Sequence, residues 1–282
     1  MARIVLGHRD GALATRLART VLSDLTAEWP DLQLVPRTVA GEPVGDDDPI
    51  LRGLLGGQLG LAVVACETLS AALPEELALV SVTRRLEPRL ALVTKGAASL
   101  SALANGARLG IGAERDRPFL ASGFPGMEAE RVGTDVDRAL ARLAVGELDA
   151  LVLPACVLIM MDRRDHIGTL LEPEVLPPAP GQGSLALLAR ADDDLAAEVA
   201  YTLQHRPSFD RVRAERSFAA GLAGRALGAL ASVSEEGELT LFGAVAVGAT
   251  TLQASVTGDA REAEELGGEL AKDVAQQLEA MG

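Results

Sequence analysis

Two arginines lie where the chain is suited to bind an anion. Arg9 belongs to the glycine-flanked loop 7–11, and Arg115 belongs to the start of a predicted helix, 114–122. Backbone N–H groups and the helix dipole favour negative charge at such positions. We therefore expect Arg9 and Arg115 to bind a carboxylate or phosphate, with His8 as a neighbouring ligand contact. The alternatives are surface ion pairs for the arginines and a solvated loop position for His8.

Thr68, Cys66 and Cys156 are further candidates for chemistry. Thr68 can donate a hydrogen bond to a ligand, although no histidine or lysine stands near it in the sequence to activate it as a nucleophile. Each cysteine follows a predicted buried strand and is either a reactive thiol or, as we favour, a buried small hydrophobic residue. The two cysteines and three scattered histidines show no metal-ligand spacing, so we expect no metal.

The pattern of apolar residues predicts an α/β fold with two doubly wound domains and a small C-terminal α+β domain. Leu13, Leu17, Val21 and Leu25 recur every four residues and predict a helix after a first strand. We expect the first domain to comprise residues 1–95 and 183–205, the second 96–182 and the third 206–282. In such folds, ligands bind beyond the carboxyl ends of the strands. The predicted strands of the first two domains are 3–6, 31–39, 59–64, 108–111, 130–132 and 148–153. Their further predicted helices are 50–57, 114–122 and 136–145. Those of the third domain are strands 237–247 and 250–257 and helix 260–281.

Several motifs along the whole chain resemble those of one enzyme family. They are EPEVLPPAPGQGSLALLAR (172–190), AERSFAAGLAGRALGAL (214–230), RRLEPRLALV (84–93) and LGLAVVACETLSAALPEELAL (59–79). In their order and spacing they are similar to the hydroxymethylbilane synthases, also called porphobilinogen deaminases. The resemblance implies three domains with a cleft between the first two. It also implies a dipyrromethane cofactor held by a thioether to a cysteine of the third domain.

The chain departs from this family at the positions to which the resemblance assigns chemistry. Ala226 stands where the cofactor cysteine is expected, and an alanine has no thiolate to form the thioether. Thr68 stands where a catalytic aspartate is expected, and Glu67 replaces the lysine before it. Arg115 is retained, whereas most other arginines of the family's anion contacts are replaced. We therefore expect no cofactor and no confirmed catalytic residue.

Two functions of different classes follow from these residues. The first is a member of the hydroxymethylbilane synthase family in tetrapyrrole (porphyrin and heme) biosynthesis, by resemblance a transferase, without the standard dipyrromethane-dependent polymerisation of porphobilinogen. It would then be a pseudoenzyme in respect of that reaction. The second is a non-catalytic binding or regulatory protein whose two-lobed cleft resembles that of periplasmic binding proteins and holds a small anion. In both cases the expected partner is a small molecule, either a pyrrole or a small carboxylate.

Composition narrows the remaining function classes. The formal net charge of −14 repels nucleic acids and anionic membrane surfaces, and aromatic residues are only 2% of the chain, too few for base stacking. No apolar run reaches the roughly 20 residues of a membrane span, and the first residues lack a signal-peptide pattern. We expect a cytoplasmic protein that binds neither nucleic acid nor membrane.

Overall fold

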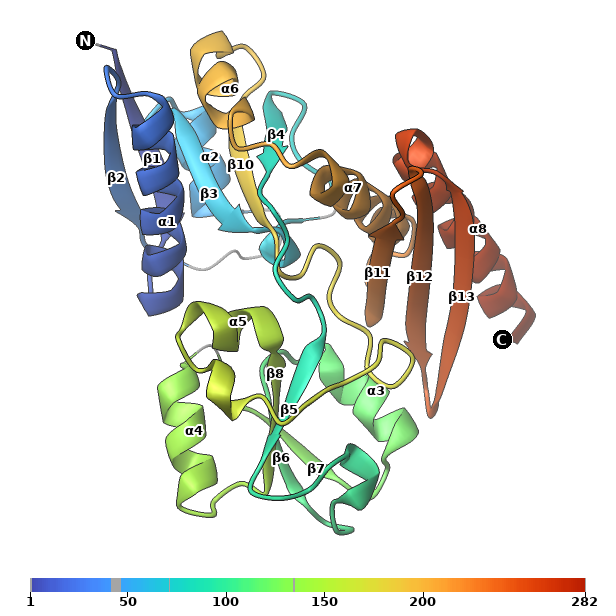
Figure 1. Ribbon diagram of the computed structural model, residues 1–282. Coiled ribbons are helices and arrows are strands. Elements are labelled where there is room, and N and C mark those ends of the chain that lie inside the picture. The colour runs from blue at the N-terminus through green and yellow to red at the C-terminus, as the bar shows by residue number, and fades with distance from the viewer. Residues whose placement is uncertain (1, 42–46, 71, 134, 282) are drawn as a thin grey trace. The chain divides into compact units, whose positions relative to one another are not determined.

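The computed structural model describes residues 2–41, 47–70, 72–133 and 135–281 (Figure 1). Its contacts divide the chain into two compact units. The first unit comprises Met1–Arg85 and Ser184–Val212, and the second comprises Leu86–Gly183 and Arg213–Gly282. Each unit therefore combines segments that are distant in the sequence.

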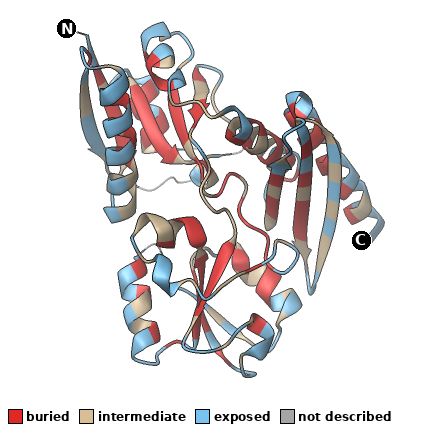
Figure 2. Cartoon of the chain, viewed as in Figure 1, coloured by how far each residue is buried: buried red, intermediate tan, exposed pale blue. Residues whose placement is uncertain are grey.

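The first unit contains a five-stranded mixed sheet in the order β2-β1-β3-β10-β4. β1 pairs in parallel with β2 and β3, whereas β10 runs antiparallel to both β3 and β4. Figure 2 shows β3 buried along most of its length and the edge strand β2 mostly exposed or half-buried. The strands are β1 (Arg3–Arg9), β2 (Gln33–Val39), β3 (Leu61–Ala65), β4 (Leu77–Val82) and β10 (Leu185–Arg190).

Helices cover both faces of this first sheet. Helix α1 (Ala12–Glu28) and helix α6 (Asp194–Tyr201) bury their apolar stripes against one face, where Val21 and Val199 meet Leu6 and Leu187 in one cluster. Helix α2 (Pro49–Leu55) packs in a separate cluster with other residues of β3 and β10. Side chains alternate across a strand, so the two clusters lie on opposite faces.

The second unit contains another five-stranded mixed sheet, in the order β7-β6-β8-β5-β9. β6 is parallel to β7 and β8, and β5 is antiparallel to β8 and β9. Helix α3 contributes to one core cluster of this sheet, and helices α4 and α5 to the other. The elements are β5 (Leu90–Thr94), β6 (Arg108–Ile111), β7 (Glu128–Arg131), β8 (Ala150–Pro154), β9 (Thr169–Leu170), α3 (Asp116–Gly123), α4 (Val136–Ala144) and α5 (Ala155–Met160).

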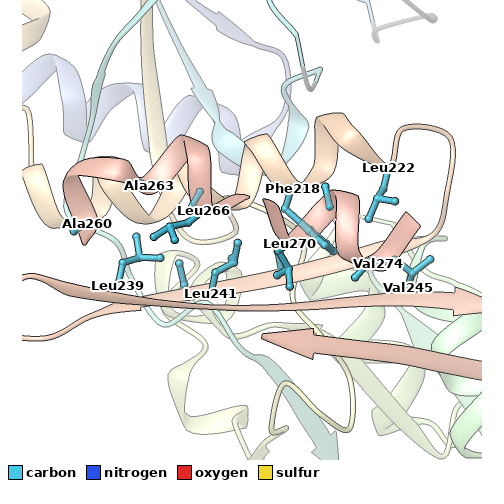
Figure 3. Packing of buried hydrophobic residues seen from close by; sticks show 14 of the residues in the cluster. Phe218, Leu222, Leu239, Leu241, Val245, Ala260, Ala263, Leu266, Leu270 and Val274 are labelled. Atoms are coloured by element: carbon cyan, nitrogen blue, oxygen red, sulfur yellow. The ribbon is translucent and has the colours of Figure 1, made fainter. Parts of the chain in front are cut away.

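An antiparallel three-stranded sheet completes the second unit, with one whole helix and the part of another helix that begins at Arg213. Its elements are α7 (Arg206–Gly221), β11 (Leu227–Val233), β12 (Glu238–Val247), β13 (Thr250–Asp259) and α8 (Ala263–Met281). Phe218 and Leu270 pack over Leu241 in its core (Figure 3). Gly267 allows α8 to approach α7 closely, because a Cβ at this position would lie 2.2 Å from the carbonyl oxygen of Ala214.

The α/β fold class with a small C-terminal sheet and helix is confirmed, but several expected details differ. Residues 206–221 form helix α7, where we predicted no helix or strand. β5 belongs to the second sheet, although residues up to 95 were expected in the first domain. Both sheets also contain antiparallel strands, which βαβ winding alone does not predict. Among the described residues, no helix is long and apolar enough to cross a membrane.

Candidate functional site

Arg9, at the end of β1, is held by a carboxylate of its own unit. Its Nη1 donates to Asp48 Oδ1 at 3.1 Å and its Nη2 to Asp48 Oδ2 at 2.6 Å. Asp48 Oδ1 also accepts a hydrogen bond from the backbone N–H of Ile50 at 2.9 Å and thereby caps α2. The anion that the sequence led us to expect at Arg9 is thus supplied, in this structure, by a side chain 39 residues away.

His8 and Gly11 complete this end of β1. His8 is buried, with Nδ1 2.8 Å from the carbonyl oxygen of Arg9 and Nε2 3.4 Å from Thr38 Oγ1. It is therefore packed against the sheet, in contrast to the solvated alternative. Gly11 begins α1 with φ 108°, a left-handed conformation that favours glycine.

The turn after β3 carries Cys66, Glu67 and Thr68 in a short 3₁₀ helix, Cys66–Thr68. Thr68 is exposed, and its Oγ1 donates to the carbonyl oxygen of Ala65 at 2.8 Å. Cys66 is buried. Burial of the carboxyl group raises the pKa of Glu67 to about 7, although its own backbone N–H and the charge of Arg85 lower it. Glu67 is the carboxyl group of this turn, and we had considered it only as the replacement of the family's lysine.

Arg115 lies at the start of α3 in the second unit, and protein oxygens surround its guanidinium. Nε donates to the carbonyl oxygen of Leu227 at 3.1 Å, and Nη2 donates to that of Pro177 at 2.8 Å. Nη1 lies 3.0 Å from Asp116 Oδ1, and the ring of Phe119 is 5.4 Å from the guanidinium carbon. Burial lowers the pKa of Arg115, while Asp116 raises it. Burial also raises the pKa of Asp116, against the pull of Arg115.

The structure brings Arg115 close to position 226, where a cysteine was expected. Ala226 is half-buried and directly precedes β11, and its carbonyl oxygen accepts from the N–H of Ala246 at 2.9 Å. The next residue, Leu227, supplies the carbonyl oxygen bound by Arg115 Nε. Gly228 is also confined, because a Cβ there would lie 2.5 Å from Pro177 Cβ and 2.8 Å from Arg115 Nη2.

A buried glutamate that we did not predict as a site residue positions the Pro-Gly-Gln-Gly segment. Glu215 on α7 is fully buried; its Oε2 accepts from the N–H of Gly181 at 2.6 Å and its Oε1 from that of Ala231 at 2.7 Å. Gln182 Nε2 donates to the carbonyl oxygen of Pro88 at 2.6 Å. The sequence signal was present, since Glu215 belongs to the Ala-Glu-Arg-Ser motif, but the pairing across 34 residues was not readable.

The two candidate thiols lie in different units. Cys66 belongs to the first, and Cys156, buried in α5, belongs to the second. Arg9 and Arg115 are divided in the same way. Within the described part of the chain, no group of three or more His, Cys, Asp or Glu residues could hold a metal ion.

Comparison with known proteins identifies the family. The model named "Porphobilinogen deaminase, dipyromethane cofactor binding domain" matches residues 4–198. The porphobilinogen deaminase of Thermus thermophilus is 38% identical, over 98% of this chain and 97% of its own length. That of Deinococcus radiodurans is 33% identical, over 97% and 96%. Among solved structures, the BenM effector-binding domain with benzoate has a TM-score of 0.48 at 14% identity, covering 72% of this chain and 90% of its own.

These matches correct our expectation that the chain has no cofactor. The matched model is the cofactor-binding domain itself, and porphobilinogen deaminases carry dipyrromethane, so the expectation was wrong. The structure tests only the residue at which the cofactor would be attached. Residue 226 lies outside the matched range and ends in a methyl group, so this residue does not fit a thioether to the cofactor.

The match extends over nearly the full length of both sequences. The family model covers most of the first unit and the five-stranded sheet of the second, and the two relatives cover 98% and 97% of the chain. The expected resemblance is therefore confirmed by comparisons that do not depend on single motifs. This chain belongs to the porphobilinogen deaminase family.

Proposed function

We propose that this chain acts on porphobilinogen, or on a closely related pyrrole, in tetrapyrrole biosynthesis. It would do so as a transferase of the hydroxymethylbilane synthase type. The growing product would not be attached to the protein through a thioether at residue 226. Full-length similarity to porphobilinogen deaminases supports the substrate class. The methyl side chain of Ala226, next to the carbonyl that Arg115 binds, is the observation that carries the second part.

The alternative, a non-catalytic small-anion binding protein, gains no support from the geometry. Its two expected contacts, Arg9 and Arg115, already bind a carboxylate and two backbone carbonyls respectively. We propose that these arginines contact a ligand only if the ligand displaces the protein oxygens to which they now donate hydrogen bonds. A ligand with few negative charges suits such a site best, because strong anions need uncommitted cations.

The experiment is an incubation of the protein with porphobilinogen. Consumption is followed with an aldehyde reagent for pyrroles, linear tetrapyrrole is followed after its conversion to uroporphyrin, and peptides are mapped by mass spectrometry. We expect porphobilinogen to be consumed while the peptide containing Ala226 keeps its unmodified mass. A protein that leaves porphobilinogen untouched would refute the proposed activity.

A matched pair of variants tests the role of position 226. Ala226→Cys places a thiol beside the Arg115 contact, and Ala223→Cys places one at an exposed position of the same loop. After incubation with porphobilinogen, we expect a pyrrole adduct on Cys at 226 and none at 223. Equal labelling of both thiols, or of neither, would show that position 226 has no special relation to the pyrrole site.

A further inference from the structure

The carboxyl group of Glu67 has a buried oxygen atom that lacks a hydrogen bond. Its Oε2 is inaccessible to solvent and has no hydrogen-bond partner among the described residues. Thr68, the next residue, is exposed, and its hydroxyl group donates a hydrogen bond to the carbonyl oxygen of Ala65. Leaving a buried carboxylate oxygen unpaired destabilises the folded state, because its lost hydration is not replaced. Such unpaired groups are few in native proteins, and a catalytic role or a bound water or ion is among their causes.

A second unpaired polar atom lies directly before the neighbouring strand of the same sheet. Ser184, directly before β10, is 1% exposed, and its Oγ has no partner within the described chain. Its carbonyl oxygen accepts from the N–H of Cys66 at 2.9 Å, so it stands beside the turn that carries Glu67. Two buried polar atoms without partners at one end of β3 and β10 indicate a place where a polar ligand or water completes the hydrogen bonding.

The charges around Glu67 suit a group that gains and loses a proton. Arg85, which follows β4, is the cation that acts on it, and the backbone N–H of Glu67 acts in the same direction. Burial acts against both and prevails, so the pKa of Glu67 rises to about 7. A carboxyl group with this pKa populates both forms near neutral pH, which is the condition for efficient proton transfer.

We propose that Glu67 is the group through which this chain exchanges a proton with its pyrrole ligand. In the forward step, the ionised carboxylate accepts one proton from an N–H or C–H bond of the pyrrole, whose bonding electrons stay on the ring. The resulting carboxylic acid then gives that proton to the amine nitrogen, which leaves with the electron pair of the broken C–N bond, or to water. No electrons are gained or lost overall. This inference rests on the proposed function and adds the residue that handles the proton.

The first test detects the proton on Glu67 without any ligand. Infrared spectra across neutral pH should show the carbonyl band of one buried carboxylic acid disappearing as the pH rises through about 7. Glu67→Gln should lack this titrating band, and Glu198→Gln, at an exposed position on α6, should retain it. A wild-type spectrum without such a band would overturn the inference.

The second test follows the proton during ligand binding and turnover. Calorimetric titration with porphobilinogen in two buffers of different ionisation enthalpy should reveal proton exchange in the wild type and in Glu198→Gln, but not in Glu67→Gln. Glu67→Gln should also slow porphobilinogen consumption by about 100-fold or more. Glu67→Asp, which keeps a carboxyl group, should recover part of the rate with a shifted pH profile.

The outcomes separate this inference from the proposed function. A wild-type protein that neither binds nor consumes porphobilinogen would overturn both. A wild type that consumes it, with Glu67→Gln indistinguishable from Glu198→Gln in proton exchange and rate, would overturn only the role of Glu67.

Discussion

Replacing Glu215 with glutamine should destabilise the second unit by about 2 to 3 kcal/mol. The carboxylate accepts hydrogen bonds from two backbone N–H groups, those of Gly181 and Ala231, through different oxygens. In glutamine one of these oxygens becomes an amide NH₂ group, which donates and cannot accept. One buried N–H then loses its acceptor, and the charge that strengthened the other hydrogen bond is lost. Glu215→Ala removes both acceptors and should cost about 4 kcal/mol or more.

Thermal unfolding and amide hydrogen exchange would measure this loss. A loss of 2 to 3 kcal/mol should lower the Tm by about 4 to 8 °C in a chain of this size. Exchange at the amides of Gly181 and Ala231 should accelerate about 30-fold or more, since 1.4 kcal/mol corresponds to a factor of ten. These two amides are the specific readout, because each donates directly to Glu215.

Glu269→Gln is the matched control for this substitution. Glu269 is exposed on α8, in the same unit, so the same chemical change there should alter stability by less than about 0.5 kcal/mol. If Glu215→Gln lowered the Tm no more than Glu269→Gln and left both amides protected, the two hydrogen bonds would not stabilise the segment as we infer.

Three further predictions follow from contacts in the two units. Arg9→Gln and Asp48→Asn should each lower the free energy of unfolding in urea by about 3 kcal/mol, because each leaves one partner of a half-buried ion pair alone. A double-mutant cycle should show strong coupling between the two residues, and additive losses would contradict the pairing. Gly228→Ala should cost about 1 to 3 kcal/mol, measured in the same way, because its Cβ meets Pro177 Cβ at 2.5 Å; an unchanged unfolding free energy would show that the neighbours yield freely. The pKa of Glu67 is about 7 in the folded state against an ordinary value of 4.5, so the folded state holds its proton more tightly. Wild-type stability therefore falls as the pH rises through this window. Glu67→Gln should remove that fall, gaining about 3 kcal/mol relative to the wild type between pH near 4 and near 8; parallel pH curves would contradict the raised pKa.

Local patterns in the sequence predicted the elements whose stability comes from one amphipathic face. The four-residue spacing of apolar residues located α1, and the bounds of β6 agree with the predicted strand 108–111. Helix α7 was missed because much of its surface is charged, so no apolar stripe marks it. Its few apolar residues, such as Val212 and Phe218, are instead fully buried in two separate clusters. This burial depends on tertiary contacts that periodicity does not encode.

The candidate site was predictable in its residue types but not in its pairings. Arg9 and Arg115 could be singled out in the sequence, yet their acceptors are 39 and 112 residues away. Arg9 also belongs to β1, not to the loop 7–11 that we predicted. The protonation behaviour of Glu67 depends on how deeply its carboxyl group is buried, which a turn sequence does not specify. The cofactor expectation was wrong because one missing thiol was weighed more heavily than a domain-wide similarity.

The placement of β10 between β3 and β4 has a consequence for how the chain acquires its structure during synthesis. β10 pairs with β3 across 120 residues, as in the Leu185–Ala65 pair, and the whole second sheet is made in between. The first sheet therefore lacks an interior strand until residue 190 has left the ribosome, whereas residues 86–183 form a continuous segment. We expect the later-encoded sheet to fold first, with β3 and β4 exposing unpaired edges in the meantime. The growing chain should be most prone to aggregation and most dependent on chaperones during this interval.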